Sequence, residues 1–500
     1  MRSRFVTKLG PLLLLLFVAC AAWTQTSVDS HEASLASARL LLKNGDFKGA
    51  AAAFRQLNET RPSAEAYAGL VQSLLKQDEV KAADESSRAG LSAFPDSAIT
   101  HAARGDVQFR RGLIPDAENE FDAALKIDPK SARAWLGQGR VDAALSRRAK
   151  AKAAVAKAHE LDPDDGDALY EWAVRQPYPL NIEGLEKHLA EFHNDPETDR
   201  REREFKDFLN ALAGRKVWVP ARQVPRAEIN LESLPMGPGM SPRGYGVRVR
   251  LNDRATVTLM LDTGASGVII TRKLAEKVGA HKLSEQALEG LGKSGVNAGY
   301  KAWVDKVVIG NLEFHDCFIH ATPHEIAEVD GTIGGDVFSN YLVSVDFSRQ
   351  KLRLEPLPPA SDGAENSASG SFAQAYTFGH LLLVSTEAGK KASGLFIIDT
   401  GANINTITPE LGKSVPDMHA SNLTMSGASG QVSSAFFTND ATLVFAKTRK
   451  TGATMSTVDL HAISKDLGVE VSGQIGFNAM WGKKSMTINY RDGLVEFEGK

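Results

Sequence analysis

The sequence has little cysteine, little net charge and no long apolar run beyond its first residues. Its two cysteines are Cys20 and Cys317, so a mature protein in which Cys20 is cleaved off or lipidated has no internal disulfide. A chain of 500 residues predicts two to four domains, with cores large enough to be stable without one. A formal net charge of −3 favours neither nucleic acid nor an anionic membrane surface as a partner.

The first residues have the pattern of an export signal. Basic residues precede an apolar run from Leu12 to Ala22 that ends among small residues, and this run is shorter than the ~18 residues of a membrane span. We therefore expect a signal over 1–24 and a periplasmic or secreted protein, with an uncleaved anchor as the alternative. Phe17–Cys20 resembles a bacterial lipobox, although Phe17 stands where leucine is usual. A lipid anchor at Cys20 therefore stays open.

The N-terminal third contains a repeat. Prolines recur at intervals of 33, 34 and 34 residues and alanines keep the same period, as Pro62, Pro95, Pro129 and Pro163, and Ala50, Ala83, Ala117 and Ala151 show. Small residues let paired helices approach, and a helix does not run through proline. The pattern resembles tetratricopeptide (TPR) repeats. This resemblance implies an α-helical solenoid over 34–175 that binds a protein partner, followed by a helical connector over 176–225.

The pattern changes from helical to alternating near Arg226. Val247 to Leu251 alternates apolar and polar residues, as a half-buried strand does. A stretch rich in Pro, Ala, Ser, Asp and Gly at 358–371 indicates a linker. It separates two segments of similar length, 226–357 and 372–500, which we expect to be two all-β lobes.

A motif occurs once in each of these segments. Leu-Met-Leu-Asp-Thr-Gly-Ala, from Leu259 to Ala265, recurs as Phe-Ile-Ile-Asp-Thr-Gly-Ala from Phe396 to Ala402. A given tripeptide such as Asp-Thr-Gly is expected by chance about once in ten chains of this length, so two copies that each end an apolar strand indicate duplication. The match continues at equal offsets with Ile270 and Ile407, Thr271 and Thr408, and Leu274 and Leu411. Further downstream, Ile333-Gly334 and Ile475-Gly476 follow the two aspartates at about the same distance.

This doubled pattern resembles the pepsin-like and retropepsin-like aspartic peptidases. The resemblance covers residues 226–500 and implies a two-lobed acid-protease fold and an aspartic endopeptidase that needs no cofactor or metal. It makes Asp262 and Asp399 the catalytic pair. The expected supporting residues are Thr263 and Thr400, which would bond the two loops, the glycines Gly264 and Gly401, and the elements Ile333-Gly334 and Ile475-Gly476.

The chemistry requires two carboxyl groups side by side. Such a pair shares one proton, because both members cannot ionise cheaply. The ionised member acts as general base on a water, and the protonated member donates to the scissile carbonyl. Ala265 and Ala402 stand where pepsin-like members commonly have serine. Since a hydroxyl donor favours the ionised carboxylate, its loss predicts a mildly acidic to near-neutral optimum.

Two glycine-rich segments are candidate flaps over the cleft. They lie at corresponding places in the two segments and include Gly292 and Gly295 in the first and Gly427 and Gly430 in the second. Their flexibility suits a movable hairpin, although an ordinary surface turn would have the same composition.

Other polar clusters have simpler interpretations. Cys317 and His320 would face opposite sides of a strand, so we expect a buried cysteine and no zinc site. Asp330 and Asp336 are interpreted as solvated turn carboxylates. For the whole chain the alternative function is a scaffold that grips peptides without cutting them. Two ionisable groups facing each other favour the peptidase.

Overall fold

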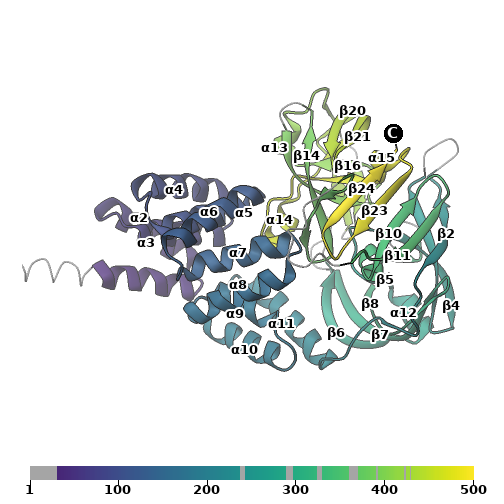
Figure 1. Cartoon of the computed structure of the whole chain (residues 1–500), viewed down its shortest axis with the longest axis horizontal. Helices are drawn as coiled ribbons and strands as arrows, with labels where there is room; N and C mark the ends of the chain where they lie inside the picture. The colour runs from purple at the N-terminus through teal and green to yellow at the C-terminus, as the bar shows by residue number, and fades with distance from the viewer. Residues whose placement is uncertain are drawn as a thin grey trace, which may run out of the picture.

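The computed structural model describes residues 31–236, 242–288, 297–323, 329–359, 370–389, 392–421, 424–427 and 430–499. Helices come first and strands follow (Figure 1), which confirms the predicted order of a helical repeat domain and a β-rich region. Within these ranges no helix has the length and apolar character needed to cross a membrane. The predicted signal at 1–24, with Cys20, lies outside the described residues, and so does most of the predicted linker.

The helical domain begins with a helix over residues 31–43. The helices that follow pack against their neighbours in chain order. They are α2 (Phe47–Thr60), α3 (Ala64–Lys76), α4 (Val80–Ala93), α5 (Ala98–Arg110), α6 (Ile114–Ile127), α7 (Ala132–Ala144), α8 (Arg148–Leu161), α9 (Gly166–Ala173), α10 (Leu180–Glu191) and α11 (Pro196–Leu212).

The 34-residue period also appears in the residues that cap the N-termini of the helices. Four capping residues keep this spacing, and the side chain of each accepts a hydrogen bond from a backbone N–H two or three residues further on. A Ser or Asp at this position satisfies an amide that has no partner within the helix. These residues are Ser63, Ser97, Ser131 and Asp165.

Packing between repeats explains the alternation of small and bulky residues. Phe121 on α6 is fully buried. A Cβ atom placed on Gly105 of α5 would lie 2.5 Å from the Phe121 ring, and one on Gly137 of α7 would lie 2.2 Å from it. Glycine at these two positions therefore allows one phenylalanine to pack between consecutive repeats.

The first half of the β-rich region contains a short helix and most of a large sheet. Its elements are β1 (Val219–Pro220), β2 (Ala227–Leu234), β3 (Gly244–Leu251), β4 (Ala255–Asp262), β5 (Val268–Thr271), α12 (Arg272–Val278), β6 (His281–Leu288), β7 (Asn297–Ile309), β8 (Leu312–Thr322), β9 (Gly331–Gly334), η1 (Gly335–Phe338), β10 (Tyr341–Asp346) and β11 (Lys351–Pro356).

The second half repeats many of these elements in the same order. They are β12 (Ala373–Gln374), β13 (Tyr376–Phe378), β14 (Leu381–Ala388), β15 (Ala392–Asp399), β16 (Asn405–Ile407), α13 (Pro409–Gly412), β17 (His419–Ala420), β18 (Thr424–Gly427), β19 (Gly430–Ser433), β20 (Phe436–Phe445), β21 (Thr448–Thr457), α14 (His461–Leu467), β22 (Gly473–Gly476), α15 (Phe477–Met480), β23 (Ser485–Asn489) and β24 (Leu494–Glu498).

The strand pairings are duplicated as well. The parallel pair β4–β9 corresponds to β15–β22, and the parallel pair β5–β8 corresponds to β16–β21. The antiparallel pairs β5–β9 and β3–β7 correspond to β16–β22 and β14–β20. One topology is therefore built twice, and antiparallel pairing of β10 with β23 joins the copies.

The helical domain packs on the second half through a buried apolar cluster. Residues of α6 and α7 meet residues of β13, β14, β15 and the segment around α14. The backbone adds a bond, because Glu470 N donates to Arg110 O at 2.7 Å. We call this contact the repeat–β interface. Its buried members are Ile114, Ala117, Phe121, Val141 and Ala144, with Tyr376, Leu381, Leu383, Leu395, Ile397, Val458, Leu460, Val469 and Val471.

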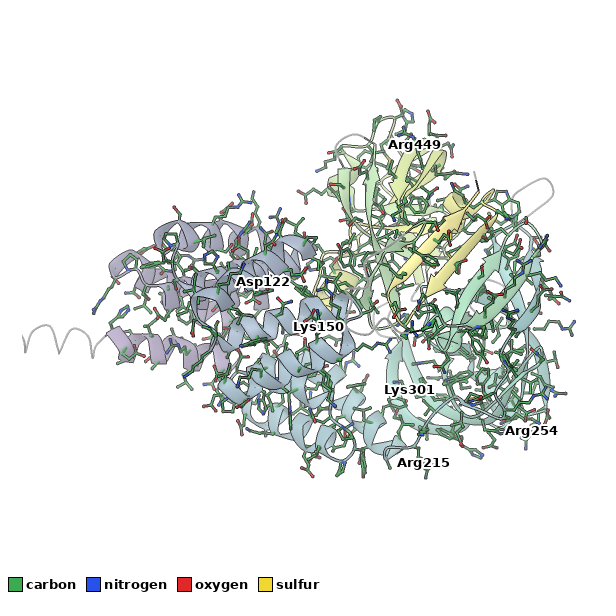
Figure 2. The ribbon with its side chains drawn as sticks, viewed as in Figure 1. Asp122, Lys150, Arg215, Arg254, Lys301 and Arg449 are labelled. Carbon is green, nitrogen blue, oxygen red and sulfur yellow. The ribbon has the colours of Figure 1, made fainter. Side chains whose placement is uncertain are left out.

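Helix α11 contacts the first half. The Phe208 ring lies edge-on to Phe318 at 5.3 Å between centroids. Lys301, labelled in Figure 2, places its Nζ atom 3.4 Å from the Phe208 centroid. Burial lowers the pKa of Lys301 to about 8. The connector therefore packs on the β-rich region.

Candidate active site

Asp262 and Asp399 end equivalent strands and lie against each other's loops. A Cβ atom placed on Gly401 would lie 2.3 Å from Asp262 Cγ, and one on Gly264 would lie 2.8 Å from Asp399 Cγ. Each carboxyl group also lies close enough to shift the pKa of the other. The structure thus brings together the two aspartates that the duplicated motif singled out. It also shows why glycine follows each Asp-Thr pair, since a side chain there would overlap the opposite carboxyl group.

Backbone amides hold both carboxyl groups in place. Gly264 N donates to Asp262 Oδ1 at 2.8 Å. Gly401 N and Ala402 N both donate to Asp399 Oδ1 at 2.9 Å. These bonds favour the ionised form and fix one oxygen of each carboxyl group.

The threonines of the two motifs bond the loops together, as the resemblance implied. The hydroxyl of Thr263 donates to Ile398 O at 2.7 Å, and that of Thr400 donates to Leu261 O at 2.8 Å. Each hydroxyl also accepts a bond from the backbone amide of the other threonine. Every polar atom of these buried side chains is therefore used across the junction of the two halves.

The elements Ile333-Gly334 and Ile475-Gly476 run beside the aspartates. Asp262 is the register partner of Gly334, and Asp399 is the partner of Gly476. A Cβ atom on Gly334 would lie 2.4 Å from Ala265 O, and one on Gly476 would lie 2.5 Å from Ile404 O. These glycines let the loop after each aspartate fold back against the neighbouring strand.

The environment of the pair favours a retained proton. Burial, followed by the charge of Asp399, raises the pKa of Asp262 well above its ordinary value. Burial also raises the pKa of Asp399, and backbone amides oppose that rise. Two buried carboxyl groups in contact hold one proton between them more readily than two negative charges.

Two further residues contact this site and were not predicted. Gln474 on β22 donates from Nε2 to Asp399 Oδ2 at 2.9 Å. The ring of His380, between β13 and β14, places Nε2 3.2 Å from Gly264 O. Comparing the two copies of the Ile-Gly element one residue upstream would have singled out Gln474, because threonine occupies that place in the first copy. No local pattern marks His380.

The interpretation of Asp336 as a solvated turn carboxylate is wrong. Ser266 Oγ donates to Asp336 Oδ2 at 2.9 Å, and Gly267 N donates to Oδ1 at 2.9 Å. The carboxylate therefore fixes the turn that follows the first Asp-Thr-Gly. Asp330 likewise accepts a bond, from Thr258 N at 3.2 Å.

The structure describes one of the two candidate flaps, on a hairpin. Gly292 and Gly295 lie outside the described residues, between the paired strands β6 and β7. Gly427 and Gly430 are register partners in the small sheet of β18 and β19. A flap role for either hairpin stays a prediction.

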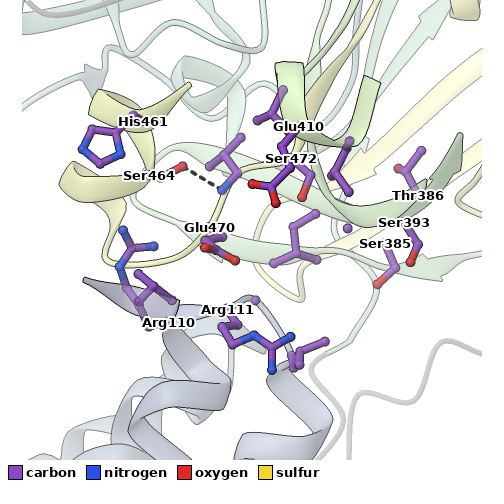
Figure 3. Close-up of a pocket in the computed structure, with 18 of the residues that line it drawn as sticks. Arg110, Arg111, Ser385, Thr386, Ser393, Glu410, His461, Ser464, Glu470 and Ser472 are labelled. Atoms are coloured by element: carbon purple, nitrogen blue, oxygen red, sulfur yellow. Dashed lines mark hydrogen bonds between the residues drawn. The ribbon is translucent and has the colours of Figure 1, made fainter. Parts of the chain in front are cut away.

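A large cavity lies away from the aspartates, between the repeats and the second half. It has a volume of about 1590 Å³, and Figure 3 shows Arg110 and Arg111 of the repeats on one side and Glu410, Glu470 and Ser472 on the other. Neither Asp262 nor Asp399 lines it. Burial raises the pKa of Glu470.

Cys317 is fully buried, as predicted, and burial raises the pKa of its thiol. Burial lowers the pKa of His320 to about 3, and the charge of Lys301 adds to this effect. Across the part of the chain that the structure describes, no three His, Cys, Asp or Glu side chains are grouped so that they could hold a metal ion.

Known protein families match both the helical region and the β-rich region of the chain. The chain matches the aspartyl protease family over residues 247–337 and the tetratricopeptide repeat family over 35–98 and 102–168. It therefore contains TPR repeats and an aspartyl protease domain, which includes Asp262 and Gly334. No curated protein matches the chain.

Three solved structures are each similar to about a third of this chain. A thermophilic TPR protein of Thermus thermophilus is 21% identical, with 35% of this chain and 97% of that chain covered and a TM-score of 0.28. PilF of Pseudomonas aeruginosa is 19% identical, with 36% and 83% covered and a TM-score of 0.25. The Cut9–Hcn1 hetero-tetramer of the APC/C is 22% identical, with 34% and 33% covered and a TM-score of 0.30.

Proposed function

We propose that this protein is a two-lobed aspartic endopeptidase of the pepsin-like and retropepsin-like kind. The observation that carries the proposal is the close approach of Asp262 and Asp399, a half-buried and a buried carboxyl group that equivalent loops of the two β-rich halves hold against each other. Binding alone would not need two ionisable groups pressed together, whereas hydrolysis needs a base and an acid at one place.

The reaction follows from the shared proton. A water between the carboxyl groups gives its proton to the ionised aspartate as it attacks the scissile carbonyl carbon. The protonated aspartate donates to the carbonyl oxygen, and a tetrahedral diol forms. Its collapse breaks the C–N bond while a proton passes to the leaving amine, so no covalent enzyme intermediate arises. Substrates are therefore protein or peptide chains.

The repeats would recruit a protein, either the substrate or a partner. Solenoids of this type present extended surfaces for protein binding, and here the solenoid is packed on the catalytic region through the repeat–β interface. The export signal predicted at 1–24 places this activity in the periplasm or outside the cell, with lipidation at Cys20 as an open variant.

The test is cleavage of a peptide library by the full chain. We expect defined cuts, read by mass spectrometry, from the wild type between about pH 4 and 7. Asp262→Asn and Asp399→Asn should each lower kcat/KM by at least about 10²–10⁴-fold. Asp305→Asn is the matched control, because Asp305 lies exposed on β7. Cleavage unaffected by either active-site change would reject the assignment. Peptide binding without cleavage would favour the scaffold.

A further inference from the structure

The two halves differ at one buried position beside the aspartates. Thr332 on β9 pairs in register with Met260, two residues before Asp262. Gln474 on β22 pairs with Ile397, two residues before Asp399. Both side chains are buried, with 2% and 4% of their surface exposed. The duplicated topology therefore holds a short side chain at this place in one half and a long amide in the other.

Both polar atoms of the Gln474 amide have a hydrogen-bond partner. Its Nε2 donates to Asp399 Oδ2 at 2.9 Å, and its Oε1 accepts from the hydroxyl of Thr406 at 3.0 Å. The second bond fixes which end of the amide faces the carboxyl group. In the first half, by contrast, the Thr332 hydroxyl has no hydrogen-bond partner among the residues that the structure describes.

We propose that Gln474 is a positioning residue that makes Asp399 the ionised, proton-accepting member of the pair and leaves the shared proton on Asp262. The inference rests on the proposed peptidase function. A donor favours the charged form of the group that accepts from it. Asp399 accepts three N–H bonds, from Gly401, Ala402 and Gln474. Among the described residues, the donors that face the Asp262 carboxyl group are the backbone N–H groups of Gly264 and Ala265, and none of them is a side-chain amide.

Neighbouring charges act in the same direction. His380, when protonated, favours the ionised form of Asp399. Among the described residues near Asp262, the titratable groups include Asp399 and Tyr490, and burial and the charges of Asp336 and Asp262 raise the pKa of Tyr490. Gln474 thus supplies in the second half a side-chain donor of the kind that Ala402 lacks, and no described residue of the first half donates a side-chain hydrogen bond to Asp262.

This assigns the proton transfers. Asp399 accepts the proton of the attacking water, and Asp262 gives its proton to the scissile carbonyl oxygen. With Gln474 replaced by a residue of similar size and no donor, Asp399 remains able to act. The pKa of Asp399 then rises, so the acidic limb of the pH–activity profile moves to higher pH.

The experiment is the pH profile of kcat/KM for the full chain. Gln474→Leu should move the acidic limb upward by about 1–2 pH units, the equivalent of one hydrogen bond to a charged group. Thr406→Val, which frees the amide to rotate, should move it in the same direction by less. Thr332→Val is the matched control at the equivalent place, and its profile should stay with that of the wild type.

The outcomes separate this inference from the proposed function. An active Gln474→Leu protein with an unmoved acidic limb would overturn it, since a structural role lowers activity without moving the profile. An alkaline limb that moves downward would also overturn it, because Asp399 would then be the protonated member donating to a turned amide. If Gln474→Leu does not fold, the acidic limb of Thr406→Val tests the inference instead, and an unmoved limb would overturn it. Absence of cleavage by the wild type, or cleavage by Asp262→Asn, would reject the peptidase and this inference with it.

Discussion

Thr263 and Thr400 exchange hydrogen bonds across the junction of the two β-rich halves. The backbone N–H of each donates to the hydroxyl oxygen of the other, and both distances are 3.0 Å. The exchange is symmetric although the two residues are 137 positions apart. The relative placement of Asp262 and Asp399, each one residue upstream, therefore depends on this pair.

We expect Thr263→Val to impair both stability and activity. It removes the acceptor for Thr400 N and the donor to Ile398 O, and both groups are buried. One buried group left without a partner costs about 1–3 kcal/mol, and displacement of the aspartates by about 1 Å would lower kcat about 10²-fold. Thr263→Ser keeps the hydroxyl and is the control. Urea unfolding and kcat measure the effects, and equal results for the two variants would contradict this account.

Gly401→Ala should be the more damaging of the two glycine changes. Its methyl group would lie 2.3 Å from Asp262 Cγ, whereas the methyl group of Gly264→Ala would lie 2.8 Å from Asp399 Cγ. Overpacking of this kind costs about 1–3 kcal/mol. If the overlap with Asp262 is the cause, Gly401→Ala should cost less in an Asp262→Ala background. A double-mutant cycle of unfolding free energies tests this, and additive effects would exclude the overlap as the cause.

Asp262→Asn should make the protein more stable at neutral pH while abolishing cleavage. The native pKa of Asp262 is raised above its ordinary value of 3.8. Above about pH 3.8 the unfolded chain loses this proton while the native state keeps it, so wild-type stability falls as pH rises. Asparagine removes that penalty. Calorimetry should show a melting temperature higher than that of the wild type at pH 7, by roughly 2–4 °C for each kcal/mol gained, and no difference near pH 3.

The residues that could be predicted from the sequence are those that belong to a short motif of consecutive residues. Asp-Thr-Gly identifies an aspartate, a threonine and a glycine in each half, because one loop needs all three. Gln474 acts through a contact 75 positions away, and within its own segment it belongs to no motif, so only a comparison of the two copies of the Ile-Gly element singles it out. The error at Asp336 has the same origin, since Ser266 and Gly267, its partners, lie 70 and 69 positions upstream.

The repeats show the reverse case. Their prolines and alanines gave the period, and helices occur in the predicted region. The attachment of α6 and α7 to the second half was not predicted, because Ile114 and Val141 resemble ordinary core residues of a solenoid. Apolar spacing indicates that a residue is buried and leaves open which element covers it.

A half-buried ion-pair network inside the repeats predicts an opposite pH dependence. Burial acts to raise the pKa of Asp167, but Lys76, Arg133 and Arg140 outweigh it and hold this pKa well below its ordinary value. Lys76 Nζ lies 2.8 Å from Asp167 Oδ1, and Arg133 Nη1 lies 2.9 Å from Oδ2. This contribution to stability is present above about pH 3.8 and is lost as pH falls through the lower native pKa.

Asp167→Asn should therefore destabilise the protein at pH 7 by about 1–3 kcal/mol, since it leaves half-buried cations without their charged partner. The difference from the wild type should shrink as pH falls below about 3.8. Asp164→Asn is the matched control, because Asp164 is exposed in the preceding turn. Thermal melts at several pH values measure the effect, and a constant difference across pH would contradict the ion-pair explanation.

Removal of the repeats should destabilise the catalytic region. The repeat–β interface covers Leu383, Leu395 and Ile397, and the last two lie on β15, the strand that ends at Asp399. A fragment of residues 226–500 would expose this apolar surface to water, at a cost of roughly 25 cal/mol for each Å². We expect it to bind a hydrophobic dye, to associate and to melt at a lower temperature than the full chain.

The interface also offers a graded control. Ser146 and Thr377 share a hydrogen bond of 2.8 Å between their hydroxyl groups across it. Ser146→Ala removes that bond alone and should cost about 0.5–1.5 kcal/mol, so its melting temperature should lie between those of the fragment and the wild type. Because β15 ends at Asp399 and is covered by the repeats, its exposure in the fragment should also lower kcat at temperatures where the fragment is still folded. A monomeric fragment with the melting temperature and kcat of the full chain would show that the repeats are only tethered to the catalytic region.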